Sequence, residues 1–82
     1  MPIGTLKDAR KVVGAKQAAK AVEKGQACLV FLADDADIRV TAPLREACAR
    51  AGVKVEMAPS MVDLGKACGI EVGAAAVAVI KV

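Results

Sequence analysis

The sequence predicts an α/β fold, a three-layer α/β/α sandwich with a small mixed four-stranded sheet. Two wholly apolar segments, residues 28–33 and 75–80, have the length and composition of strands covered on both faces. Segments with helical spacing of apolar residues alternate with these strands. Because that alternation is typical of helices packed on both sides of a sheet, the two observations together predict three layers.

The first half of the chain contains two helices and two strands in this interpretation. A short helix runs through Ala9, and residues 11–13 form a short strand that ends at Gly14. Helical spacing follows over residues 15–24, and Gly25 supplies the stop expected just past a helix end. The apolar strand 28–33 comes next, and its uniform hydrophobicity excludes an exposed edge position.

A second long helix is indicated where apolar residues recur at i, i+3, i+4 and i+7, at Leu44, Ala47, Cys48 and Ala51. We expect Thr41 to be its N-cap residue, because a threonine side chain can accept a hydrogen bond from the first turn. Pro43 fits the first turn, where its missing N–H has no partner to lose, and Gly52 closes the helix.

The last part of the chain is predicted to be strand, helix, strand. Residues 53–57 alternate apolar and polar side chains, so this strand lies nearer an edge of the sheet. Ser60 and Asp63 form a capping-box pattern for a short helix ending at Gly69. The strand 75–80 then completes the sheet.

Composition limits the chain to one domain, residues 1–82, with one hydrophobic core. Hydrophobic residues make up 56% of the sequence, but Phe31 is the single aromatic residue, so the core consists of aliphatic side chains and alanine. Twelve Lys and Arg against nine Asp and Glu give a net charge of +3. This mild excess permits an RNA partner without requiring one.

Several function classes have no candidate residues. The three cysteines, Cys28, Cys48 and Cys68, form no CxxC pair and the chain has no histidine, which argues against zinc and favours buried reduced thiols. No nucleophile lies beside a base and no glycine-rich phosphate loop is present, so we expect neither an enzyme nor a cofactor. Without a signal-peptide layout or an apolar run long enough for a membrane, we expect a cytoplasmic protein.

The sole carboxylate cluster consists of Asp34, Asp35 and Asp37. We favour a solvated loop that caps the next helix over a catalytic or metal site, because acidic residues are common at helix N-termini.

One helix face is basic. Lys16, Gln17, Lys20 and Lys24 fall within an arc of roughly 100°, opposite the alanines and valine of the same segment. Gly14 permits close approach by another backbone, and the N–H groups of the first turn would attract phosphates or guanine edges. An ordinary solvated helix face explains the lysines equally well. The apolar Ile70 and Val72 are likewise either contacts for a flipped base or core side chains.

Four segments resemble one known family across nearly the whole chain. They are residues 14–21 (GAKQAAKA), 33–37 (ADDAD), 60–61 (SM) and 64–78 (LGKACGIEVGAAAVA), of which the last is the most specific. These segments are similar to those of the kink-turn-binding ribosomal proteins of the seven-Ae and thirty-e type, and particularly of their short bacterial YbxF-like relatives.

The resemblance implies a protein that binds structured RNA containing a kink-turn, with no DNA or membrane partner, and leaves association with the ribosome open. The helix beginning at Gly14 would enter the widened major groove beside tandem sheared G·A pairs. Lys16 and Gln17 would face guanine edges or phosphates, and Lys20 would donate to a guanine O6 or a phosphate. The loop of Ile70, Glu71 and Val72 would cover the flipped-out nucleotide.

The chain departs from part of this family at the helix start. Archaeal and eukaryotic members have Asn-Glu where this chain has Lys16-Gln17, whereas bacterial relatives share Lys-Gln. Since Gln lacks a carboxylate and Lys adds a charge, the resemblance implies kink-turn binding with a larger electrostatic part. The alternative is a protein-interaction module or structural ribosomal subunit, in which Ile70 and Val72 would meet protein.

Overall fold

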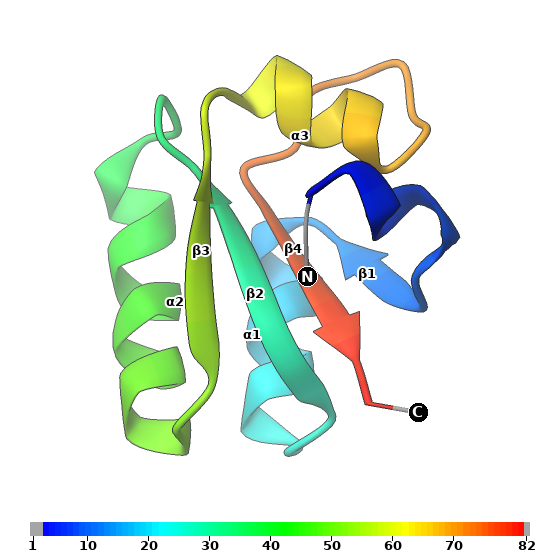
Figure 1. The fold of residues 1–82 in the computed structure, drawn as a ribbon. Coiled ribbons are helices and arrows are strands. Elements are labelled where there is room, and N and C mark those ends of the chain that lie inside the picture. The colour runs from blue at the N-terminus through cyan, green and yellow to red at the C-terminus, as the bar shows by residue number, and fades with distance from the viewer. Residues whose placement is uncertain (1–2, 82) are drawn as a thin grey trace.

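The computed structural model describes residues 3–81; Met1, Pro2 and Val82, which fall within the predicted single domain, lie outside the described residues. The elements in chain order are the 3-10 helix η1 (Ile3–Asp8), β1 (Lys11–Val13), α1 (Ala15–Glu23), β2 (Ala27–Ala33), α2 (Ile38–Ala51), β3 (Lys54–Ala58), α3 (Met61–Ala67) and β4 (Ala76–Ile80). Helices α1 and α2 cover one face of the sheet, and α3 with η1 covers the other (Figure 1). The predicted three-layer α/β/α fold is confirmed.

The sheet is mixed, with strand order β1-β4-β2-β3. β4 is antiparallel to both of its neighbours, β1 and β2, while β2 and β3 are parallel. The two strands predicted to be buried, β2 and β4, are the two central ones, and β3 is an edge strand as its alternating pattern indicates.

The central strands are apolar throughout because successive side chains enter different cores. Phe31 packs with Leu64 on the α3 side of the sheet, and its neighbour Val30 packs with Leu44 on the α1/α2 side. Ala18 and Ala21 of α1 are buried in the second core. Their small side chains let α1 lie close to the sheet, which leaves the opposite face of this helix to solvent.

The predicted start of α2 was wrong. The helix begins at Ile38, and Asp37 is its N-cap, because the Asp37 carboxylate accepts a hydrogen bond from the Arg39 N–H at 2.9 Å. Thr41 and Pro43 therefore lie inside the helix. Aspartate and threonine are both good caps, and the sequence pattern alone did not decide between them. Pro43 deprives only the Arg39 carbonyl of a helical partner, near the exposed start of the helix.

The expectation of three buried cysteines was also wrong for one of them. Cys28 is exposed, because the register between β2 and β4 is irregular between Ala27 and Leu29 and turns the intervening side chain outward. Cys48 and Cys68 are buried, and burial raises the pKa of both thiols above the usual value.

The carboxyl ends of β1, β2 and β3 meet the start of β4 at one end of the sheet, the upper end in Figure 1. Helices α1, α2 and α3 each follow one of those three strands, so their N-termini also begin at this end. The Gly14 N–H donates to the Ala76 carbonyl at 2.8 Å, which fixes the start of α1 beside the start of β4. Within residues 3–81 no helix is both long and apolar enough to span a membrane.

Candidate RNA-binding surface

The N-terminus of α1 is open. Its N-cap residue, Gly14, has φ 106° and ψ 147° and makes no side-chain capping bond. An L-residue rarely adopts this φ, which explains the glycine. Apart from its chain neighbours, none of the described residues lies within 4 Å of the position a Cβ would take, so this side of Gly14 is open. The first N–H groups of α1 have no intrahelical acceptor and remain available to an external one.

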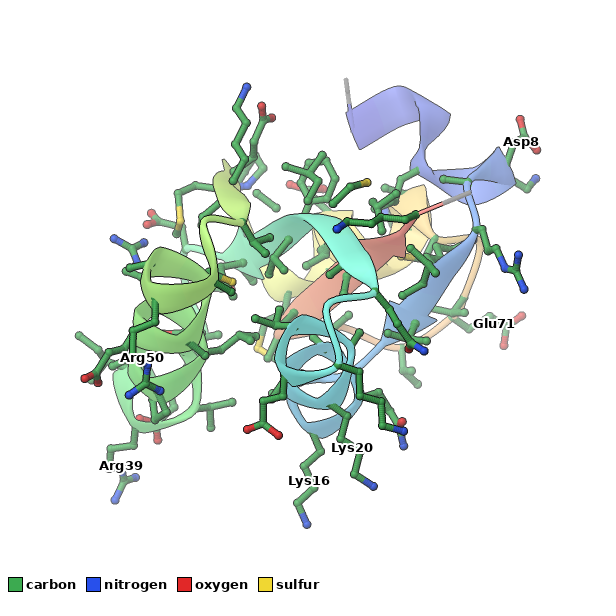
Figure 2. All side chains as sticks on the ribbon, turned by 90° about the horizontal axis from the view of Figure 1, so that it is seen from below. Asp8, Lys16, Lys20, Arg39, Arg50 and Glu71 are labelled. Atoms are coloured by element: carbon green, nitrogen blue, oxygen red, sulfur yellow. The ribbon has the colours of Figure 1, made fainter. Side chains whose placement is uncertain are left out.

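Lysine side chains flank this open helix end. Lys16 and Lys20 extend from α1 in the same direction, away from the sheet (Figure 2), and Gln17 is exposed beside them. Neither lysine forms an ion pair with any residue in the described range 3–81. The N-terminus of α1 carries the positive end of the helix dipole, and these two lysine side chains extend from the first turns of the same helix. This part of the surface therefore attracts anions.

Of the three residues predicted for the 69–73 loop, one is anchored in the core and two are exposed. Ile70 is half-buried and packs against the α3-side core, so it contributes to the core and not only to the surface. Val72 is 71% exposed and Glu71 is also exposed. An open hollow of about 310 Å³ adjoins them, lined by Val62, Lys66, Ile70, Glu71, Val72 and Gly73.

Close packing against α3 sets the position of this loop. A Cβ at Gly65 would overlap the Val72 carbonyl oxygen, and a Cβ at Gly73 would press on Met61. The Met61 carbonyl also accepts a hydrogen bond from the Ala74 N–H at 3.0 Å. We did not predict the roles of Gly65 and Met61 from the sequence. The signal was available, because a glycine inside a predicted helix indicates close approach by another segment.

The acidic cluster is structural. Asp37 caps α2, and the Asp35 Oδ1 accepts from the Met61 N–H at 2.7 Å, linking the 34–37 loop to the start of α3. Hydrogen bonds from Arg39 lower the pKa of Asp37 below its usual value. Over residues 3–81 no group of three or more potential ligands could hold a metal ion.

The two parts of the candidate surface are adjacent in the backbone but differ in chemistry. The Gly14–Ala76 hydrogen bond brings the start of α1 next to the segment that leaves the 69–73 loop. Lys16 and Lys20 lie on the α1 side of the molecule, whereas Glu71 lies well apart from them (Figure 2). The predicted residues therefore form a basic part on α1 and a mainly apolar part on the loop, at one end of the sheet.

Known proteins resemble this chain in sequence and in fold. The sequence matches the Ribosomal protein L7Ae/L30e/S12e/Gadd45 family over residues 3–82. It is 46% identical over 76 residues to an RNA-binding protein of Geobacillus sp. (strain WCH70), and 42% identical over 76 residues to the RNA-binding protein YbxF of Geobacillus stearothermophilus. Each alignment covers 93% of both chains.

A solved structure extends the similarity to the fold. The 15.5kD RNA-binding protein of Giardia lamblia superposes with a TM-score of 0.89 and 32% sequence identity, covering 98% of this chain and 71% of that one. The resemblance inferred from the four sequence segments is thereby confirmed. With a family match over nearly its entire length and close relatives of the same size, this chain belongs to the ribosomal protein L7Ae/L30e/S12e/Gadd45 family.

Proposed function

We propose that residues 1–82 form one noncatalytic RNA-binding domain that recognises and stabilises kink-turn motifs in structured RNA in the cytoplasm. The observation that carries this proposal is the open N-terminus of α1, which has no side-chain cap and is followed by the exposed Lys16 and Lys20 in the first turns of the helix. Membership of a family with relatives named as RNA-binding proteins supports it.

In this proposal α1 enters the major groove where the kink widens it. An undistorted A-form major groove is too narrow for side chains, so a bent helix is the accessible target. Lys16 and Lys20 donate to phosphates or to guanine O6, and the Gln17 amide can both donate to and accept from base edges. The buried alanines on the opposite side hold the helix rigidly against the sheet.

The loop covers the nucleotide that the kink expels from the stack. Val72 supplies exposed apolar surface for a base, and the Glu71 carboxylate can accept from an exocyclic amino group. Ile70 acts mainly through the core, where it holds the loop in place. The chain has no tryptophan or tyrosine, so base stacking on a surface aromatic side chain contributes nothing.

Binding stabilises the bent RNA by a shift in populations. A protein that binds the kinked form better than the extended form drives bending in proportion to that difference in affinity. The lysines of α1 would also offset the repulsion between phosphates that the kink brings together.

Titration of the protein against a kink-turn RNA and a plain duplex of equal length, each labelled for energy transfer, tests the proposal at two salt concentrations. We expect tighter binding to the kink-turn, with induced bending. Lys20→Ala should weaken that binding and lower the slope of log K against log salt by about one unit, the effect of one lost phosphate contact. Lys54→Ala on the edge strand β3 is the control and should leave the slope unchanged; this lysine is exposed and pairs with Glu56 at 3.4 Å.

Two results would contradict the proposal. Unchanged kink-turn affinity in Lys20→Ala would remove α1 from the binding surface. Equal, weak and strongly salt-dependent binding of both RNAs would favour the alternative function, a protein-interaction module or structural ribosomal subunit in which the exposed Val72 meets a protein partner.

A further inference from the structure

A basic hollow lies at the opposite end of the sheet from the candidate surface, the lower end in Figure 1. It has a volume of about 530 Å³ and is lined by Arg10, Lys11, Val12, Gly25, Gln26, Ile80 and Lys81. None of the described residues that line it is acidic. Two backbone hydrogen bonds join residues that line the hollow. One runs from the Ile80 N–H to the Arg10 carbonyl at 2.9 Å, and the other from the Lys81 N–H to the Gln26 carbonyl at 2.7 Å.

Of the three cationic side chains that line this hollow, one makes a hydrogen bond within the protein and two make no ion pair with any described residue. The Lys11 ammonium donates to the Lys7 carbonyl at 2.9 Å, where it satisfies the end of η1. Arg10 and Lys81 are exposed, and neither forms an ion pair with any other residue of the described chain. Gln26 is also exposed. Two cations and one amide are therefore free to contact a ligand.

The lysines of α1 connect this hollow to the open helix end. Lys16, Lys20 and Lys24 follow one another at intervals of four residues, and Gly25 and Gln26 continue directly into the hollow. Lys16 and Lys24 are about 12 Å apart along the helix axis, at 1.5 Å per residue. The one acidic residue of α1, Glu23, lines a hollow together with Lys16 and with Arg50 of α2. Because it comes seven residues after Lys16, it lies on nearly the same side of the helix, between Lys20 and Lys24 in the sequence.

We propose that this lower hollow is a second RNA contact, in which Arg10 and Lys81 bind backbone phosphates of the stem that continues away from the kink. The inference rests on the proposed function, because α1 must lie along the RNA for its far end to reach that stem. The Arg10 guanidinium suits a phosphate through paired N–H donors, and Lys81 supplies a point charge. Such contacts position the protein and increase affinity without adding sequence specificity.

The test uses the double variant Arg10→Gln/Lys81→Gln and kink-turn RNAs that differ only in stem length. One RNA has a stem just long enough to close the kink, and the other has one more helical turn on the same stem. Extensions are made on each of the two stems in turn, since either could follow α1. The control is Arg50→Gln/Lys54→Gln, which also removes one arginine and one lysine charge, but from α2 and β3.

We expect the double variant to bind one extended RNA roughly tenfold more weakly than wild type, the size expected for two exposed charge contacts, and to lower its salt slope by about two units. Its affinity for the short RNA should match that of wild type, and the control should bind all RNAs like wild type. An equal loss on short and extended RNAs would show a general charge effect and overturn the proposal, as would no loss on either extension.

Failure of the proposed function would look different. Wild-type protein would then bind kinked RNA and straight duplex equally. Even in that case, a loss in the double variant that appears only on the longer of two straight duplexes would still support the second contact.

Discussion

The N-termini of α1 and α2 lie at the same end of the sheet and point the same way, yet their chemistry is opposite. At α2 the Asp37 carboxylate accepts from the Arg39 N–H and forms an ion pair with the Arg39 guanidinium at 2.8 Å. At α1 the capping residue is Gly14, which has no side chain to offer, and Lys16 follows. One helix end is satisfied by its own chain, and the other is left for an external acceptor.

The cap determines whether a helix N-terminus has a structural role or can bind a ligand. Every helix N-terminus presents unpaired N–H groups and partial positive charge. A capping carboxylate removes that attraction for anions, whereas a glycine cap beside lysines preserves it. An exposed helix end is therefore informative about function only after its cap has been identified, and here the caps distinguish α1 from α2.

The largest expected effect comes from removing two charges at α1 and comparing the result with the same change at α2. Lys16→Gln/Lys20→Gln should lower affinity for kink-turn RNA about 100-fold or more, because each charge-assisted hydrogen bond contributes about 1.5–3 kcal/mol. Arg39→Gln/Arg45→Gln should lower it by less than about threefold, through screened long-range charge alone. Titration with labelled RNA measures both, and circular dichroism checks folding.

Equal losses in the two double variants would contradict the difference between the two helix ends. They would mean that net charge governs binding and that the open end of α1 has no special role.

A substitution in α3 can disturb the 69–73 loop without altering the N-terminus of α1 or of α2. Gly65→Ala should lower the free energy of unfolding by about 1–3 kcal/mol, because the new methyl group would overlap the Val72 carbonyl oxygen. Displacement of the loop should also weaken RNA binding. At an unobstructed helix position the same change would raise stability by up to about 1 kcal/mol. A higher melting temperature in this variant would therefore contradict the close contact.

The smallest effect tests the cap of α2 through pH. Asp37→Asn keeps a capping side chain but removes its charge. The hydrogen bonds from Arg39 lower the pKa of Asp37 in the folded protein, so the charged carboxylate stabilises the fold above the unfolded pKa of about 3.9. That stabilisation is lost as the pH falls through the lowered folded pKa.

Wild type should therefore melt at a higher temperature than Asp37→Asn near neutral pH, and the two curves should converge in acid. Thermal melts across this range measure the difference, while RNA affinity at neutral pH should stay the same in both proteins. A difference in melting temperature that does not change with pH would show that the charge of Asp37 does not act as proposed.

Much of the fold could be predicted because buried and exposed positions of a strand or helix differ in residue type, and this difference is visible in the sequence. The uniformly apolar strands could only be central, and the alternating residues 53–57 could only lie near an edge. The start of α2 was missed because Asp37 and Thr41 are both acceptable caps, and only tertiary contacts select one. Cys28 was missed because a register irregularity between two strands cannot be seen in either strand alone.

The candidate site was partly predictable for a related reason. The basic face of α1 follows from helical spacing alone, and the resemblance supplied the loop. The sequence did not show which loop residue is half-buried and which is exposed. Ile70 and Val72 are both apolar, and only packing in the folded protein distinguishes them. The contact between Gly65 and Val72 joins residues whose proximity depends on how the chain returns over α3.

The central position of β4 has a consequence for when the protein becomes active. Although it is the last element in chain order, it lies between β1 and β2, and its Ala76 carbonyl holds Gly14 at the start of α1. A nascent chain that still lacks β4 has β1 without a partner strand and no fixed helix start. Synthesis must therefore proceed through residue 80, and that segment must leave the exit tunnel, before the α1 end is assembled. The strand order thus requires β4 to be in place before the N-terminus of α1 can take its final position.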